Sequence, residues 1–304
     1  MSQALALAVL AGIISGGLGL APLSGSFGLV LIGYFVQLPM MLAGLTLGLA
    51  AALIAASTAT LLSAMIAGLL PALVFVIAFA LPALWLVRRA LLSRQDQGAD
   101  LVWFPPGLIL AELAVMAVLA LGLAFFAFTN QPGGLLGVIE SMLSQAFEQL
   151  SAAAGRPVPD AEFLKSRALF VPAVVACSWL IMAVVNGVLA QTIAVRSGWN
   201  RRPSPELAEL ELPFWLWPLI GVAALLALMG PTGLGLFGRS ALIVLVVPFG
   251  FLGLAVIHKF ANRWPYRQIG LTAVYIGIIV FNWPILAVVA LGLVEDWAHL
   301  RRYM

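Results

Sequence analysis

Residues Met41–Leu70 read MLAGLTLGLAAALIAASTATLLSAMIAGLL and contain no charged residue. The absence of charge extends over the first 87 residues, which hold no Asp, Glu, Lys, Arg or His, and the first charges are Arg88 and Arg89. A soluble domain needs charge on its surface, whereas a charge at the centre of a bilayer costs about 2.5–3.5 kcal/mol. This stretch therefore predicts helices that are solvated by lipid.

The composition of the whole chain agrees with its first third. Of its 304 residues 63% are hydrophobic and 9% are charged, and the mean hydropathy is +1.11, whereas soluble domains carry about 25% charged residues. We therefore expect residues 1–304 to form a single integral membrane domain with the lipid bilayer as its main partner. A single cysteine, Cys177, excludes intrachain disulfides, and two histidines give no basis for a metal site. We expect no cofactor and no nucleic-acid partner.

Proline, glycine and polar residues divide the chain into apolar segments. The segments are Leu5–Leu20, Phe27–Leu38 (ending at Pro39), Met41–Gly68, Pro71–Val87, Pro106–Phe128, Leu169–Val195, Phe214–Met229, Ala241–Ile257 (after a turn at Gly230–Gly238) and Ile269–Val294. About 20 residues are needed for one spanning helix, so the chain predicts an all-α polytopic bundle of about eight crossings, four of them within residues 1–90. Some helices must be short or broken, because Asn282-Trp283-Pro284 interrupts the last segment, which is either a hairpin or one kinked span.

Two longer polar regions and the distribution of basic residues predict the topology. Residues 128–167 form a loop in which apolar residues recur at helical spacing over Leu135–Leu150, as in an amphipathic interfacial helix. All but four of the 15 Lys and Arg residues lie in the segments 88–100, 196–212 and 259–267 and in the tail 297–304. The positive-inside rule places these segments in the cytoplasm. We thus expect a bacterial inner-membrane protein with both termini cytoplasmic and the 128–167 loop external.

Polar residues within apolar segments are the candidate functional residues. Glu112 lies six residues after Pro106 inside an apolar segment, and an intramembrane carboxylate indicates a proton, cation or ligand site. The alternative is a structural acid that bonds to a polar group of a neighbouring helix. The other candidates for a ligand or proton pathway, and for partners of Glu112, are Asn186, Gln191, Tyr275 and Asn282. Buried amides in lipid also serve simply to hold helices together.

Small residues recur every four positions in the first segment, at Ala4, Ala8 and Gly12. Such a stripe allows close approach of helix backbones. It predicts either internal packing or a docking face for a membrane partner subunit or a second copy of the chain.

Motifs for energy conversion and hydrolysis are absent from the sequence. It contains no Gly-x-x-x-x-Gly-Lys-Ser/Thr loop, no His-Glu-x-x-His pair and no Gly-x-Ser-x-Gly elbow. We therefore expect no ATPase activity by that route and no enzyme. An intramembrane lipid enzyme is the least favoured class, because its polar or metal groups would have to converge at the interface.

Three motifs in the last third of the chain resemble a known family: ELELPFW at Glu209–Trp215, GFLGLAVIHK at Gly250–Lys259, and LGLVEDW at Leu291–Trp297 followed by Arg301. They resemble the YybS-like family of bacterial membrane proteins. Its helix layout is similar to that of the substrate-binding membrane subunits of energy-coupling-factor vitamin importers. The resemblance implies a solute-binding or transport component, with the alanine-rich first helix as a docking helix and a small solute or lipid as ligand. The alternative is a structural or assembly protein of the cell envelope, which acts through helix packing and partner binding.

Overall fold

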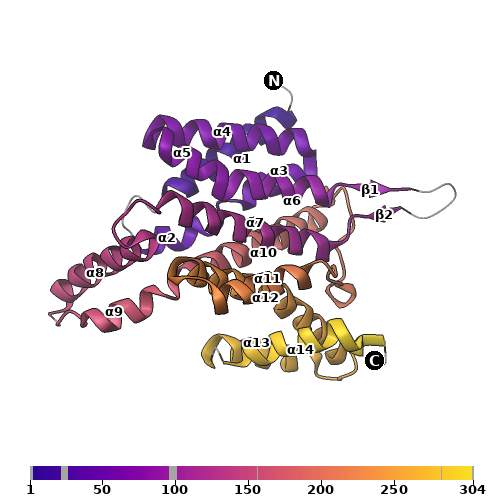
Figure 1. Ribbon diagram of the computed structural model, residues 1–304. Helices are drawn as coiled ribbons and strands as arrows, with labels where there is room; N and C mark the ends of the chain where they lie inside the picture. Colours follow the sequence, from indigo (N-terminus) through magenta and orange to yellow (C-terminus); the bar gives the residue numbers. More distant parts are fainter. Residues whose placement is uncertain (1–2, 22–26, 96–100, 156, 282, 303–304) are drawn as a thin grey trace. The chain divides into compact units, whose positions relative to one another are not determined.

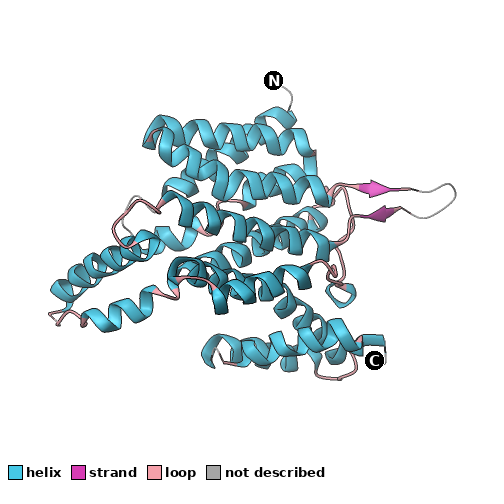
Figure 2. Cartoon of the chain, viewed as in Figure 1, coloured by secondary structure: helices cyan, strands magenta, loops and turns pink. Residues whose placement is uncertain are grey.

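The computed structural model describes residues 3–21, 27–95, 101–155, 157–281 and 283–302. Figure 2 shows that helices make up nearly all of this chain, with one short hairpin of two strands. The α-helices, labelled in Figure 1, are α1 Gln3–Leu20, α2 Phe27–Gly33, α3 Leu38–Leu47, α4 Leu49–Ala67, α5 Leu69–Phe75, α6 Leu81–Ala90, α7 Pro106–Ala127, α8 Gly134–Ala154, α9 Ala161–Ala168, α10 Val171–Arg196, α11 Leu216–Met229, α12 Thr232–Ala261, α13 Arg267–Phe281 and α14 Pro284–Ala298. The strands are β1 Ser93–Arg94 and β2 Val102–Trp103.

Seven stretches of the described chain are helical, long and apolar enough to cross a membrane. Four lie within the first 90 residues: α1, the stretch Gly28–Leu47, α4, and the stretch Leu69–Ala90, in which a π-helical turn at Val76–Ala80 joins α5 to α6. The others are α7, α10 and Gly233–Ala261, and the shorter helices α11 and α13 are also apolar. The predicted all-α polytopic bundle is confirmed, and the number of eight crossings stays a prediction.

Two helix boundaries near the N-terminus differ from the prediction. Pro39 does not end a segment but stands in the first turn of α3, where a missing backbone N–H costs nothing. The alanine-rich stretch after it is not one helix, because Gly48 separates α3 from α4. Gly48 has φ +104° and ψ 172°, a conformation that only glycine adopts readily. Gly68, with φ +95°, separates α4 from α5 in the same way.

Further corrections concern the second half of the chain. The turn predicted at Gly230–Gly238 is much shorter, since α12 begins at Thr232. Gly238 lies inside that helix against the backbone of Leu226 and Ala227 in α11, an approach that a side chain would prevent. The last apolar segment is indeed interrupted, into α13 and α14, and Asn282 lies outside the described residues.

The polar region after α7 holds two helices where the sequence predicted one. The predicted amphipathic helix is confirmed as α8, and α9 follows it with Asp160 as its cap, since the backbone N–H of Phe163 donates to Asp160 Oδ1 at 2.7 Å. The two helices pack together, with the rings of Phe147 and Phe163 at 6.3 Å. Their position outside the cell stays a prediction.

By its internal contacts the chain divides into two compact units. Unit 1 comprises residues 1–113, 181–212 and 249–304, and unit 2 comprises residues 114–180 and 213–248. Helices α7, α10 and α12 contribute residues to both, so the prediction of one membrane domain is not tested by this division. Figure 1 shows α1 beside α4 in unit 1, where Gly12 and Gly16 of α1 lie against Ala55 and Ala59 of α4.

The basic segments that were predicted to share one side of the membrane are joined by contacts within unit 1. Arg202 donates to the carbonyl of Ala90 at 3.1 Å, Arg301 donates to the carbonyl of Leu210 at 2.6 Å, and Lys259 donates to the carbonyl of Arg301 at 2.7 Å. All four segments therefore lie at one end of the unit. That this end faces the cytoplasm stays a prediction.

Candidate functional site

Glu112 forms an ion pair with a residue that the sequence did not single out as its partner. Its carboxylate accepts from Arg89, with Nη2–Oε1 at 2.7 Å and Nε–Oε2 at 2.9 Å, and from the indole Nε1 of Trp85 at 2.8 Å. The Arg89 guanidinium also lies 4.6 Å from the ring of Trp85 and 4.8 Å from that of Phe104. None of the partners suggested for Glu112 is among these contacts. The two side chains thus form a bidentate ion pair that links α6 to α7.

Asn186 takes part in a separate polar cluster near the middle of three spans. It is 1% exposed, and its Nδ2 donates to the carbonyl of Tyr34 at 2.7 Å, in the turn between α2 and α3. Gln37, fully buried in the same turn, donates to the carbonyl of Phe79 at 3.2 Å, inside the π-helical turn. These bonds tie α10 to the turn between α2 and α3, and that turn to the π-helical turn, whereas Asn186 Oδ1 and Gln37 Oε1 have no hydrogen-bond partner among the described residues. Sequence reasoning missed Gln37, although a lone Gln in an uncharged segment was a signal.

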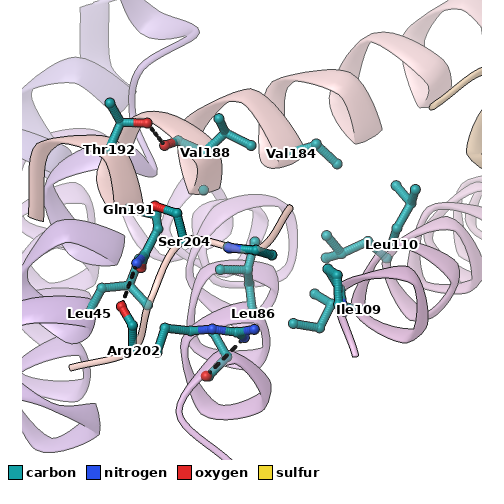
Figure 3. Close-up of a pocket in the computed structure, with 15 residues that line it drawn as sticks. Leu45, Leu86, Ile109, Leu110, Val184, Val188, Gln191, Thr192, Arg202 and Ser204 are labelled. Carbon is teal, nitrogen blue, oxygen red and sulfur yellow. Dashed lines mark hydrogen bonds between the residues drawn. The ribbon is translucent and has the colours of Figure 1, made fainter. Parts of the chain in front are cut away.

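Gln191 lies beside a cavity of about 270 Å³ in unit 1. Its Nε2 donates to the backbone carbonyl of Arg202 at 2.9 Å, and this bond holds the loop after α10 against the helix. In Figure 3, Gln191, Arg202 and Ser204 lie on one side of the cavity and Ile109 and Leu110 on the other. The cavity is lined by Leu45, Leu86, Ala90, Pro106, Ile109, Leu110, Leu113, Val184, Gly187, Val188, Gln191, Thr192, Arg202, Ser204 and Pro205.

The cavity wall is mostly apolar and has one buried cation. Arg202 is 6% exposed, its guanidinium reaches the carbonyls of Ala90 and Phe104, and it lies 5.6 Å from the ring of Trp103. Burial lowers the pKa of Arg202, because desolvation disfavours the charged form. An apolar cavity with a few placed polar groups is the usual form of a small-ligand site. Nothing in the sequence distinguishes Arg202 from the other loop arginines.

Of the remaining sequence candidates, neither Tyr275 nor the docking stripe of Ala4, Ala8 and Gly12 lines this cavity. Tyr275 lies next to His258, with its hydroxyl 3.5 Å from Nε2, and Asn282 lies outside the described residues. Of the proposed docking stripe, Ala8 packs with Ala43 and Ala51 and Gly12 packs on α4, whereas Ala4 is exposed. Ala8 and Gly12 thus serve internal packing, one of the two interpretations that the stripe allowed.

The three motifs that carried the family resemblance meet in unit 1. Glu295, 2% exposed, pairs with Arg301 at 2.7 Å, and Arg301 reaches the carbonyl of Leu210 in the first motif. Gly253 lies against the carbonyl of Val288, and Gly292 against that of Phe249, so the second and third motifs pack backbone to backbone. We call the contacts of Glu295, Arg301, Leu210 and Lys259 the C-terminal clasp. Within the described ranges no group of three or more His, Cys, Asp or Glu side chains is placed to hold a metal ion.

The seven helical stretches of the described residues that are long and apolar enough to span a bilayer define a polytopic helical membrane protein. The chain belongs to the family described as "Predicted membrane protein (DUF2232)", whose model matches residues 6–295. No curated protein and no solved structure matches the chain.

Proposed function

We propose that this protein is a membrane-embedded component that binds a small solute or lipid, in a transport system whose energy comes from an ion gradient or a separate subunit. The observation that carries the proposal is the cavity in unit 1, with its apolar wall and its buried Arg202. The interruption of the span Gly28–Leu47 at the turn between α2 and α3 supports it, because transporters build ligand sites from discontinuous helices. The resemblance of the layout to energy-coupling-factor subunits is a further argument, as is the expected place in the bacterial inner membrane.

The alternative is a structural or assembly protein of the cell envelope. It is favoured by the two acids Glu112 and Glu295, which are both engaged in ion pairs with arginines. It is also favoured by the use of the Ala8 and Gly12 stripe in internal packing. A protein of this class has no need of an occupied cavity, so occupancy separates the two proposals.

Native mass spectrometry of the purified full chain tests occupancy, with a variant that fills the cavity. Val188 lines the cavity on α10, whereas Val185, on the same helix and also exposed, does not. We expect a bound small molecule or lipid on the wild type and on Val185→Trp, and its loss from Val188→Trp. Identical occupancy of the two tryptophan variants would refute the cavity as the binding site, and a wild type with no bound molecule would favour the assembly protein.

A further inference from the structure

The two neighbouring arginines of the loop after α10 each bind the end of a helix, but in different surroundings. Arg201 is exposed and donates to the carbonyls of Thr46 and Leu47, at the end of α3, at 3.0 and 2.7 Å. Arg202 donates to the carbonyl of Ala90, the last residue of α6, at 3.1 Å. Both interactions suit a cation at a helix C-terminus. Arg201 does this from an exposed position, so capping a helix does not by itself require the burial of Arg202.

The guanidinium of Arg202 has more hydrogen-bond capacity than its surroundings use. It has five N–H donors, and beyond Ala90 its contacts are two distances of 3.5 Å, from Nη1 and Nη2 to the carbonyl of Phe104. Its Nε has no hydrogen-bond partner among the described residues. Among the described residues Arg89 and Arg301 form ion pairs with carboxylates, whereas Arg202 forms none. A buried cation that has unused donors and no carboxylate beside it is stabilised strongly by a bound anion.

The composition of the cavity wall limits what that anion is. Away from Arg202 the wall consists mainly of aliphatic side chains from α6, α7 and α10. Its other polar side chains are Gln191 and Thr192, which donate to backbone carbonyls, and Ser204 in the loop. A fully hydrated inorganic anion gains nothing from such a wall, whereas an aliphatic chain fills it. Carboxylates and phosphates match the planar donors of a guanidinium and bind it in bidentate form.

We infer that the ligand of this cavity is a small amphiphile with one oxyanion, which pairs with the Arg202 guanidinium while its aliphatic part occupies the apolar wall. This inference rests on the proposed function. It names the class of ligand and assigns Arg202 as its recognition residue. A free fatty acid and a lipid with a phosphate head group share this chemistry.

Isothermal titration calorimetry with the full chain in phosphatidylcholine nanodiscs tests the inference, with decanoate, decyl phosphate and decanol as probes. We expect the wild type to bind one of the two anions at least about tenfold more tightly than decanol, and the preferred anion identifies the source. Arg202→Gln should lose this preference and Arg202→Lys should keep part of it. Arg201→Gln is the matched control and should bind like the wild type.

A second variant keeps the test decisive if Arg202→Gln fails to fold. Val188→Trp leaves Arg202 and its carbonyl contacts in place, and it should abolish binding of the anions without loss of the fold. The wild type could bind decanol and the anions equally, or Arg202→Gln could keep the preference for the anion. Either result would overturn the inference that the ligand is anionic, while the cavity would remain the proposed binding site. If no probe binds the wild type, or if Val188→Trp binds as the wild type does, the proposed function itself fails.

Discussion

The ion pair between Glu112 and Arg89 allows a quantitative test of its structural role. We consider Glu112→Leu, Arg89→Leu and the double variant, with Arg88→Leu as the control, because Arg88 is a neighbouring exposed arginine. Glu112→Leu leaves the Arg89 guanidinium without its carboxylate, and Arg89→Leu leaves the carboxylate with the indole of Trp85 as its remaining donor. The double variant leaves no unpaired charge at this place.

The size of the effect follows from the contacts and their exposure. Glu112 accepts two bonds from Arg89, at 2.7 and 2.9 Å, and a bond to a charged group contributes about 1.5–3 kcal/mol. The side chains are 27% (Arg89) and 19% (Glu112) exposed, so the loss stays below the 3–5 kcal/mol typical of a fully buried pair. We expect each single variant to lose about 1.5–3 kcal/mol in free energy of unfolding. The double variant should lose less than the sum of the single variants, with a coupling energy of about 1.5–3 kcal/mol.

These free energies can be measured by reversible unfolding in mixed micelles of dodecyl maltoside and sodium dodecyl sulfate. Far-ultraviolet circular dichroism follows the loss of helix. Arg88→Leu should unfold within about 0.5 kcal/mol of the wild type. Single-variant losses that simply add in the double variant would show that the two charges do not stabilise each other. The carboxylate of Glu112 would then be free for the ligand or proton role that its position in the sequence suggested.

Three further predictions concern the backbone, the clasp and the polar helix. Gly48→Ala should lower the unfolding free energy by about 1–3 kcal/mol, because φ +104° with ψ 172° is almost confined to glycine. The control Gly17→Ala has open space around the new methyl group and should be neutral or slightly stabilising in the same assay. Arg301→Met should lower the free energy of unfolding by about 3–5 kcal/mol, because it leaves the buried carboxylate of Glu295 without its arginine. A thermal or detergent melt measures this, and a loss below about 1 kcal/mol would contradict a closed clasp. Met142→Asp should reduce quenching by brominated lipids of a probe on α8 if its exposed apolar face lies on the membrane, and unchanged quenching would place that face in water or on protein.

Periodicity and composition predicted the fold class because the bilayer imposes it. Backbone polar groups in lipid must be satisfied within the chain, so uncharged stretches of sufficient length have to be helices. The same argument fails at boundaries such as Pro39 and Gly48, where the local conformation depends on one residue. Proline both ends and begins helices, and only the structure tells which of the two it does at Pro39.

The candidate site was harder to predict, because burial of a polar residue does not reveal its partner. Glu112 was expected to meet an amide or a tyrosine, yet Arg89 reaches it from the loop end of α6. Gln191 lines the cavity that we propose as the site, and its amide donates to the backbone carbonyl of Arg202; its role there stays a prediction. Arg202 resembles every other loop arginine in sequence, and its burial follows from long-range packing that no local pattern encodes.

The C-terminal clasp has a consequence for the order in which the protein is made. The carbonyl of Leu210 accepts a hydrogen bond from Arg301, which lies 91 residues further along the chain and is therefore synthesised later. At ribosomal speeds of about 5–20 residues per second this is a delay of roughly 5–18 s. During that interval the loop after α10 is held by its own arginines and by the bond from Gln191 to the carbonyl of Arg202, while α11 to α14 are synthesised. Closure of the clasp by Arg301 therefore follows the synthesis of α11 to α14, and a chain that stops before this residue leaves the carbonyl of Leu210 without that donor.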